Sequence, residues 1–157
     1  MNVKKLIIAG ILLLLCFVVP LNVYTISGNQ GIGIQGSFYR YHVTILGPMI
    51  LTLMQDISYV TSGVYSGRTA LSIALWVAGS ISLVFTTLLY LIRLDNITNY
   101  FQKQSGFLLI GSGILFIGSC IVQFGPLLHG SAGLSLPFGG FLLILLGIGL
   151  IMYPSVV

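Results

Sequence analysis

Two apolar stretches near the C-terminus decide the fold that this sequence predicts: residues 105–128, SGFLLIGSGILFIGSCIVQFGPLL, and residues 133–153, GLSLPFGGFLLILLGIGLIMY. Both lie in a segment, Gln104 to Val157, that carries no charged side chain. A helix that crosses the ~30 Å hydrocarbon core of a bilayer needs about 20 apolar residues. Working outward, residues 6–23 and 69–92 also reach about that length. The sequence therefore predicts four transmembrane helices.

The composition points to the same class of protein. The 157 residues are 57% hydrophobic and 5% charged, with a formal net charge of +4. The few basic residues are scattered along the chain, so they form no patch that would bind nucleic acid. Residues 1–157 are therefore predicted to form a single domain of the all-α integral membrane class, a four-transmembrane-helix bundle in the cell membrane.

The basic residues also predict an orientation. Four of them fall on one side of the predicted helices: Lys4, Lys5, Arg93 and Lys103. The positive-inside rule places that side in the cytoplasm. Both termini and the loop 93–104 of this multi-pass chain are then cytoplasmic, and the loop 24–68 is external.

The external loop is predicted to begin with a short β-hairpin. Apolar residues alternate with polar or small ones at Ile32 and Ile34, and again at Tyr39, Tyr41 and Val43. Alternation with a period of two is typical of strands. Gly36 and Ser37 between the two runs favour a tight turn.

After Gly47-Pro48 the spacing of apolar residues becomes helical. Ile50, Leu53, Met54 and Ile57 repeat at that spacing, which predicts an amphipathic helix on the outer membrane surface. A fifth span through residues 43–60 is the alternative. Its apolar core, about eleven residues, is too short to cross a bilayer.

This order of parts resembles that of four-span proteins of the claudin and tetraspanin type. The shared features are cytoplasmic termini and a large first external loop that contains strands. Those families carry cysteines in that loop, whereas Cys16 and Cys120 both lie within apolar stretches. The resemblance concerns topology alone and implies no family membership.

Small residues recur every seven positions in three of the predicted helices, which places each series on one face. The series are Ser72, Gly79 and Thr86, then Gly111, Gly118 and Gly125, then Gly133, Gly140 and Gly147. Small residues allow close helix contact in a bilayer. We expect the last two series to face each other across a short connection. The first series packs inside the chain or, as the alternative, docks another subunit.

Few side chains suggest chemistry. His42 and His129 lie on the same predicted side of the membrane and are weak candidates for a haem or metal site, with local hydrogen bonding the favoured interpretation. Gln123 is a polar side chain near a helix end and a weak candidate for a substrate or quinone site. The external charges Arg40, Asp56 and Arg68 predict an ion pair, solvated charges or a recognition site. We expect no cofactor, no metal and no catalytic residue.

The favoured function is that of a non-catalytic accessory or structural subunit of a larger membrane assembly. Its expected partners are the lipid bilayer and other membrane subunits or copies of itself, and not nucleic acid. An alternative is a redox-linked or transport subunit that binds a quinone, a lipid or a small hydrophobic ligand between helices. A third possibility is a stand-alone adhesion or envelope protein acting through the external loop.

Overall fold

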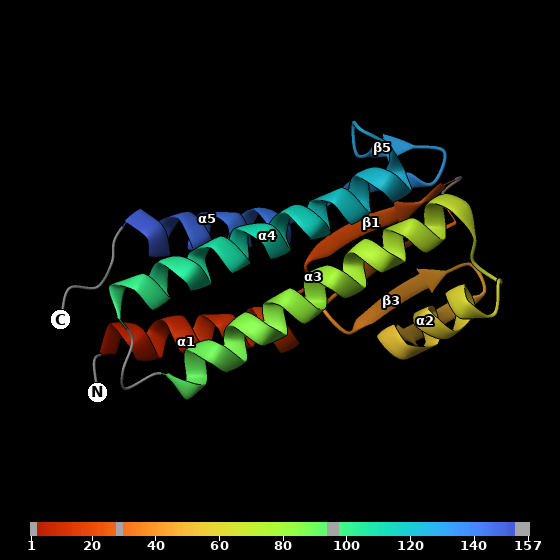
Figure 1. The fold of residues 1–157 in the computed structure, drawn as a ribbon. Helices are drawn as coiled ribbons and strands as arrows, with labels where there is room; N and C mark the ends of the chain where they lie inside the picture. The colour runs from red at the N-terminus through yellow and green to blue at the C-terminus, as the bar shows by residue number, and fades with distance from the viewer. Residues whose placement is uncertain (1–2, 28–29, 94–97, 153–157) are drawn as a thin grey trace.

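The computed structural model describes residues 3–27, 30–93 and 98–152, with the side chains of residues 3–5 left aside. Five helices and six strands occur within these ranges (Figure 1). In chain order they are α1 (Val3–Phe17), β1 (Asn22–Ile26), β2 (Gly31–Gln35), β3 (Tyr39–Thr44), β4 (Gly47–Thr52), α2 (Leu53–Thr61), α3 (Gly67–Ile92), α4 (Asn99–Phe124), β5 (His129–Gly130), β6 (Gly133–Leu136) and α5 (Phe138–Met152).

The predicted all-α bundle of four transmembrane helices is wrong. Within the described residues, only α3 and α4, at 26 residues each, are long and apolar enough to cross a membrane. Helices α1 and α5 have 15 residues each, and about 1.5 Å per residue makes them ~22 Å long. Beyond these helices, Asn22 and Val23 of the predicted span 6–23 lie in β1, and Gly133–Leu136 of the predicted span 133–153 form β6.

Proline explains where the two short helices stop and start. Pro20 follows α1, and a proline disfavours helical backbone at the residue before it. Pro137 directly precedes α5, a position that suits proline because the first helical N–H groups have no partner within the helix. The backbone groups beyond these helices bond instead in strands, β1 after α1 and β6 before α5.

The six strands form one antiparallel sheet in the order β4-β3-β2-β1-β6-β5. The hairpin predicted in the external loop corresponds to β2 and β3, which are two of six strands rather than an isolated pair. Residues 43–60 form no single span, because β4 pairs with β3 before α2 begins. The pairing of β1 with β6 joins the two ends of the chain.

The elements are arranged along the two long helices (Figure 1). Helices α1 and α5 lie beside one half of α3 and α4, and the sheet with α2 lies beside the other half. Each short helix is next to a strand of the sheet along the chain: α1 precedes β1, and α5 follows β6. The molecule therefore has a helical half and a sheet half, both held on α3 and α4.

Helices α4 and α5 pack with their backbones in contact, at pairs of glycines spaced seven residues apart. A Cβ added to Gly106 would lie 2.6 Å from the carbonyl oxygen of Gly147, and one added to Gly113 would lie 2.5 Å from that of Gly140. We call this contact the glycine seam: Gly106 and Gly113 on α4, and Gly140 and Gly147 on α5. No side chain larger than hydrogen fits there without moving a backbone.

The predicted series on α4 lies elsewhere. Gly111 faces open space, Gly118 has one neighbour, Leu75, at 3.8 Å, and Gly125 caps the C-terminal end of the helix with a φ of 101°. Gly133, predicted to begin a helical series, lies in β6. The period of seven is present in the seam, but period alone does not say which face of a helix meets its neighbour.

The series on α3 is buried against α4 and is not a free docking face. The hydroxyls of Ser72 and Ser119 each donate to the other residue's carbonyl oxygen, at 3.0 and 2.8 Å. The Ser112 hydroxyl donates to the carbonyl oxygen of Gly79 at 2.8 Å. Thr86 is completely buried. These small polar residues therefore hold α3 and α4 together within the chain.

Candidate functional site

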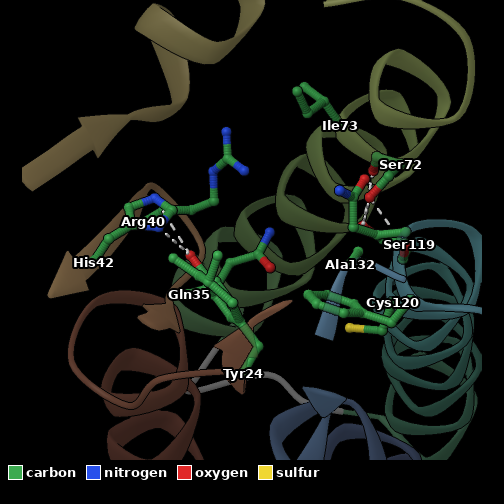
Figure 2. A pocket seen from close by; sticks show the side chains of 12 residues that line it. Tyr24, Gln35, Arg40, His42, Ser72, Ile73, Ser119, Cys120 and Ala132 are labelled. Atoms are coloured by element: carbon green, nitrogen blue, oxygen red, sulfur yellow. Dashed lines mark hydrogen bonds between the residues drawn. The ribbon is translucent and has the colours of Figure 1, made fainter. Parts of the chain in front are cut away.

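A row of three residues across the sheet builds the centre of the candidate site. Tyr24 on β1, Gly33 on β2 and His42 on β3 are aligned by the strand register and therefore point to the same face. Because Gly33 has no side chain, the Tyr24 ring lies across it, where a Cβ would collide with the ring. The Tyr24 hydroxyl thus reaches His42, 3.0 Å from Nδ1 and 3.3 Å from Nε2 (Figure 2).

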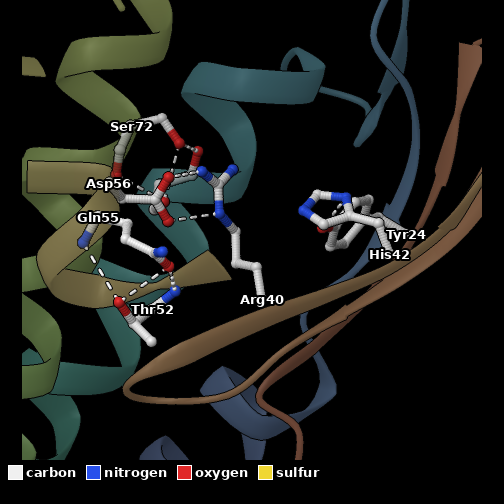
Figure 3. A network of polar contacts seen from close by, with 8 residues as sticks. Tyr24, Arg40, His42, Thr52, Gln55, Asp56 and Ser72 are labelled. Atoms are coloured by element: carbon white, nitrogen blue, oxygen red, sulfur yellow. Dashed lines mark hydrogen bonds and ion pairs between the residues drawn. The ribbon is translucent and has the colours of Figure 1, made fainter. Parts of the chain in front are cut away.

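A buried ion pair lies on the same face (Figure 3). Asp56, in the first turn of α2, is completely buried and accepts hydrogen bonds from Nε of Arg40 at 2.8 Å and from Nη2. The Arg40 side chain on β3 is 16% exposed, and its guanidinium lies 5.7 Å from the centre of the Trp76 ring. Removing either partner would leave an uncompensated charge inside the protein.

A capping box fixes the start of α2 and so positions Asp56. The Thr52 hydroxyl accepts a hydrogen bond from the backbone N–H of Gln55 at 3.3 Å, and the Gln55 side chain accepts one from the N–H of Thr52 at 2.8 Å. The arrangement satisfies two N–H groups that a helix start otherwise leaves open. Figure 3 shows this cap next to the ion pair.

Helix α3 holds the turn between β2 and β3 through two hydrogen bonds. The Trp76 indole N–H donates to the carbonyl oxygen of Gly36 at 2.9 Å, and the Ser80 hydroxyl donates to that of Ser37 at 2.6 Å. All four residues are buried. These bonds, with the ion pair, fix the sheet to the helices.

A cavity of about 220 Å³ lies between this face of the sheet and the ends of α3 and α4 (Figure 2). Its polar lining comes from the sheet and from both helices: Tyr24, Gln35, Arg40, His42, Ser72, Ser119 and Gln123. Its apolar lining includes Ile26, Ile73 and Phe124. We call this space the sheet cavity.

The sheet cavity is lined by groups that carry no net charge near neutral pH. Burial, with a smaller effect from the positive charge of Arg40, lowers the pKa of His42, so the imidazole is neutral. Burial raises the pKa of Tyr24 above its usual range, so the phenol keeps its proton. The charge of Arg40 is balanced by that of Asp56.

The structure brings together four of the candidate residues identified from the sequence. His42, Gln123 and Arg40 line the sheet cavity, and Asp56 bonds Arg40 beside it. The other two lie elsewhere. His129 is exposed on β5, and Arg68, in the first turn of α3, donates to the carbonyl oxygen of Val122 at 3.1 Å.

Among the described residues, no group of three His, Cys, Asp or Glu side chains could hold a metal ion. Cys120, which lines the cavity, and Cys16 are both buried free thiols.

Sequence reasoning missed Tyr24 as a site residue. Its partner His42 is 18 positions away, and only the strand register brings the two side chains together. A signal was present in Gly33, the small residue in the middle of an alternating strand. A glycine inside a strand often marks the close approach of another group.

The outer face of the sheet, which points away from the helices, is apolar. Its apolar side chains come from five strands, and the largest exposures are those of Ile32 (61%) and Ile50 (63%). We define the outer sheet face by its exposed apolar residues Val23, Ile32, Val43, Ile50, Leu134 and Leu136. An antiparallel sheet with one covered face usually has polar residues on the other face. Here most polar side chains, Arg40 and His42 among them, face inward, and the outer face carries the exposed apolar side chains with Thr25 and Tyr41 between them.

In comparisons with known proteins, no family model matches this chain and no curated protein matches its sequence. What the sheet cavity and the outer sheet face can do must therefore be argued from their own geometry.

Proposed function

We propose that this protein is a non-catalytic subunit of a larger membrane assembly, in which a partner subunit covers the outer sheet face. The observation that carries the proposal is the inverted polarity of the sheet. Exposed apolar patches larger than a few hundred square ångströms are rare on free-standing proteins and mark interaction sites. The outer sheet face gathers six exposed apolar side chains on five adjacent strands.

The exterior of the helical half supports a location in a lipid bilayer. Large apolar side chains are exposed on all four of its helices: Leu6 and Leu14 on α1, Ile81 and Phe85 on α3, Phe107 and Ile114 on α4, and Phe141 and Leu145 on α5. Its interior combines buried apolar side chains such as Leu83 and Leu109 with serines and glycines at the helix contacts. Such an arrangement suits a solvent that is itself apolar. In this proposal α3 and α4 cross the bilayer, and the two shorter helices lie beside them.

The direction of the chain supports an external sheet. The start of α1, the end of α3, the start of α4 and the end of α5 all lie at the end of the molecule opposite the sheet (Figure 1). Arg93 and Lys103 belong to that end, which favours the cytoplasm. On the sheet side, the charge of Arg40 is already balanced by Asp56. We therefore propose cytoplasmic termini and an external sheet half.

The polar side chains of the site support a structural role more than a catalytic one. Arg40 and Asp56 bond each other, as do Tyr24 and His42, and both pairs connect separate elements of the fold. Groups that bond each other in this way stabilise an arrangement of strands and helices. The sheet is thus a rigid platform that presents its apolar face to a partner.

The test is a native mass measurement of the tagged full chain after extraction in a gentle detergent. We expect an assembly heavier than the 16.9 kDa chain that contains a second, different protein. The double variant Ile32→Ser, Ile50→Ser should release the chain from it. The matched control is Ile114→Ser, which changes an equally exposed isoleucine on α4 and should keep the assembly.

Three outcomes would contradict parts of this proposal. A wild-type mass of one chain would remove the partner. A mass equal to a small multiple of the chain would assign the outer sheet face to a second copy. Release of the chain from membranes by alkaline carbonate would remove the bilayer location, while the partner could still be present.

A further inference from the structure

We propose that the sheet cavity is a binding site for a small, neutral ring compound that carries a carbonyl group, such as the ring of a quinone. This inference concerns the inner face of the sheet and does not depend on a partner at the outer face. It rests on unused hydrogen-bond donors, on the charge balance of the lining and on the size and shape of the space.

Donors without a partner lie at the cavity wall. Gln123, in the last turn of α4, lines the cavity, and its amide makes no hydrogen bond to any residue in the described part of the chain. Arg40 gives Nε and Nη2 to Asp56, and its remaining nitrogen, Nη1, donates to none of the described residues. Neither donor is sealed inside the protein, because within the described residues the buried side-chain group that lacks a hydrogen-bond partner is the Tyr90 hydroxyl. Both donors are therefore open to a molecule that enters the cavity. A carbonyl group in the cavity would accept from one of these donors.

The charge balance selects against ions. A bound anion would compete with Asp56 for Arg40, and both oxygens of Asp56 already accept from that guanidinium. A bound cation would find no other carboxylate in the lining. Burying an unpaired charge is far less favourable than burying a neutral group that forms hydrogen bonds. The ligand that fits is therefore neutral.

The walls and the volume select a ring. Tyr24 and Phe124 meet in the lining with ring centres 5.6 Å apart and a tilt of 45°, and Ile26 and Ile73 add apolar surface. Aromatic walls favour flat unsaturated ligands by offset or edge contacts. Pockets for drug-sized ligands span about 300–1,000 Å³. The 220 Å³ of this cavity fits a smaller molecule of one or two rings.

Trp76 provides a direct readout because it is the single tryptophan of the chain. It lies on α3 one turn after Ile73, which lines the cavity, and its ring faces the guanidinium of Arg40. Quinones quench indole emission at short range. The probe is 2-methyl-1,4-naphthoquinone, titrated into the full chain in detergent, and we expect saturable quenching of Trp76.

Two variants locate the site, and a third is the control. Gln123→Leu keeps the volume and removes the donor, and we expect the Kd to rise about fivefold, the usual effect of one hydrogen bond. Ala132→Phe places a ring at the cavity wall and should abolish saturation. His129→Ala, outside the cavity, should bind as the wild type does. If Ala132→Phe fails to fold, Gln123→Leu decides the question.

A second arm distinguishes the two sources of such a ring. The same naphthoquinone carrying an isoprenoid tail is offered in lipid nanodiscs. Tighter binding of the tailed form supports a membrane quinone as the ligand, and equal binding supports a soluble ring compound. The proposal is overturned if the wild type shows no saturable quenching by either probe up to about 1 mM. Equal quenching in the wild type, Gln123→Leu and Ala132→Phe would also overturn it.

Discussion

Two of the contacts in this molecule differ in the groups that form them. At the glycine seam, α4 and α5 touch through bare backbone, with Gly113 against Gly140 and Gly106 against Gly147. Between the sheet and the helices, the contact consists of directional polar bonds, from Trp76 to Gly36 and from Arg40 to Asp56. Close backbone contact depends on shape alone, whereas polar bonds also specify orientation. The difference shows that the sheet is oriented by charge and hydrogen bonds, and that α5 is positioned on α4 by fit.

The largest expected effect is the loss of the buried ion pair. Asp56→Ala leaves the Arg40 guanidinium, which is 16% exposed, without its counter-charge. Breaking a buried pair from one side costs about 3–5 kcal/mol of unfolding free energy. The measurement is chemical denaturation in mild detergent, followed by Trp76 emission.

A double variant separates the effect of the unpaired charge from the effect of lost packing. Arg40→Met with Asp56→Leu removes both charges and keeps apolar volume, so it should recover most of the lost stability. If the double variant is as unstable as Asp56→Ala, the lost packing and not the stranded charge is responsible.

A large side chain placed at the glycine seam should destabilise the protein. Gly113→Leu forces a side chain against the Gly140 carbonyl oxygen, and we expect a loss of about 1–3 kcal/mol, towards the upper end because a backbone must move. Gly111→Leu on the same helix is the matched control, since Gly111 faces open space and should tolerate the change. Equal effects at the two positions, measured by thermal unfolding, would contradict the seam.

The third effect is the removal of one polar bond. Trp76→Phe keeps an aromatic ring but leaves the Gly36 carbonyl oxygen without its buried donor. We expect a loss of about 1–2 kcal/mol, measured by circular dichroism because the fluorescent residue is gone. The corresponding swap on the exposed apolar exterior, Phe85→Leu, should change stability little. A Trp76→Phe protein as stable as the wild type would mean that this bond does not hold the sheet.

The sequence predicts best the helices whose backbone hydrogen bonds join residues close together in the chain. The apolar runs 69–92 and 105–128 coincide with most of α3 and α4, because a helix bonds residues four apart. The shortening of α1 and α5 is not visible in hydropathy. Strand β6 pairs with β1, more than a hundred positions away along the chain. Only the alternation in Gly133–Leu136, followed by Pro137, hinted at a strand there.

The site was predictable to a similar extent. The alternating pattern placed Arg40 and His42 on one face of a hairpin, and the structure keeps them there. Their hydrogen-bond partners Asp56 and Tyr24 come from α2 and β1. No local sequence pattern predicts which distant side chain will bond to Arg40 or His42. The glycine series on α4 failed for a related reason, because a repeat fixes spacing and leaves the choice of face to the neighbouring helix.

The smallest predicted effect distinguishes the two contacts by their response to acid. Burial, followed by the charge of Arg40, lowers the pKa of His42 in the folded protein below the 6.5 of an unfolded chain. Between these two pKa values the unfolded chain takes up a proton that the folded chain does not. Stability is therefore complete above about pH 6.5 and falls as the pH drops below it. The glycine seam contains no titratable group, so this dependence belongs to the sheet contact.

Two variants test this assignment by thermal unfolding at pH 7.5 and pH 5.0. His42→Gln should be less sensitive to acid than the wild type, because the group that titrates is gone. His129→Gln changes the exposed histidine on β5 and should keep the wild-type response. Comparing the proteins over one pH range cancels the contribution of Asp56 and other shared groups. A wild-type protein that gains stability in acid, or a His42→Gln protein with an unchanged response, would show that the Tyr24–His42 pair does not couple the sheet contact to pH.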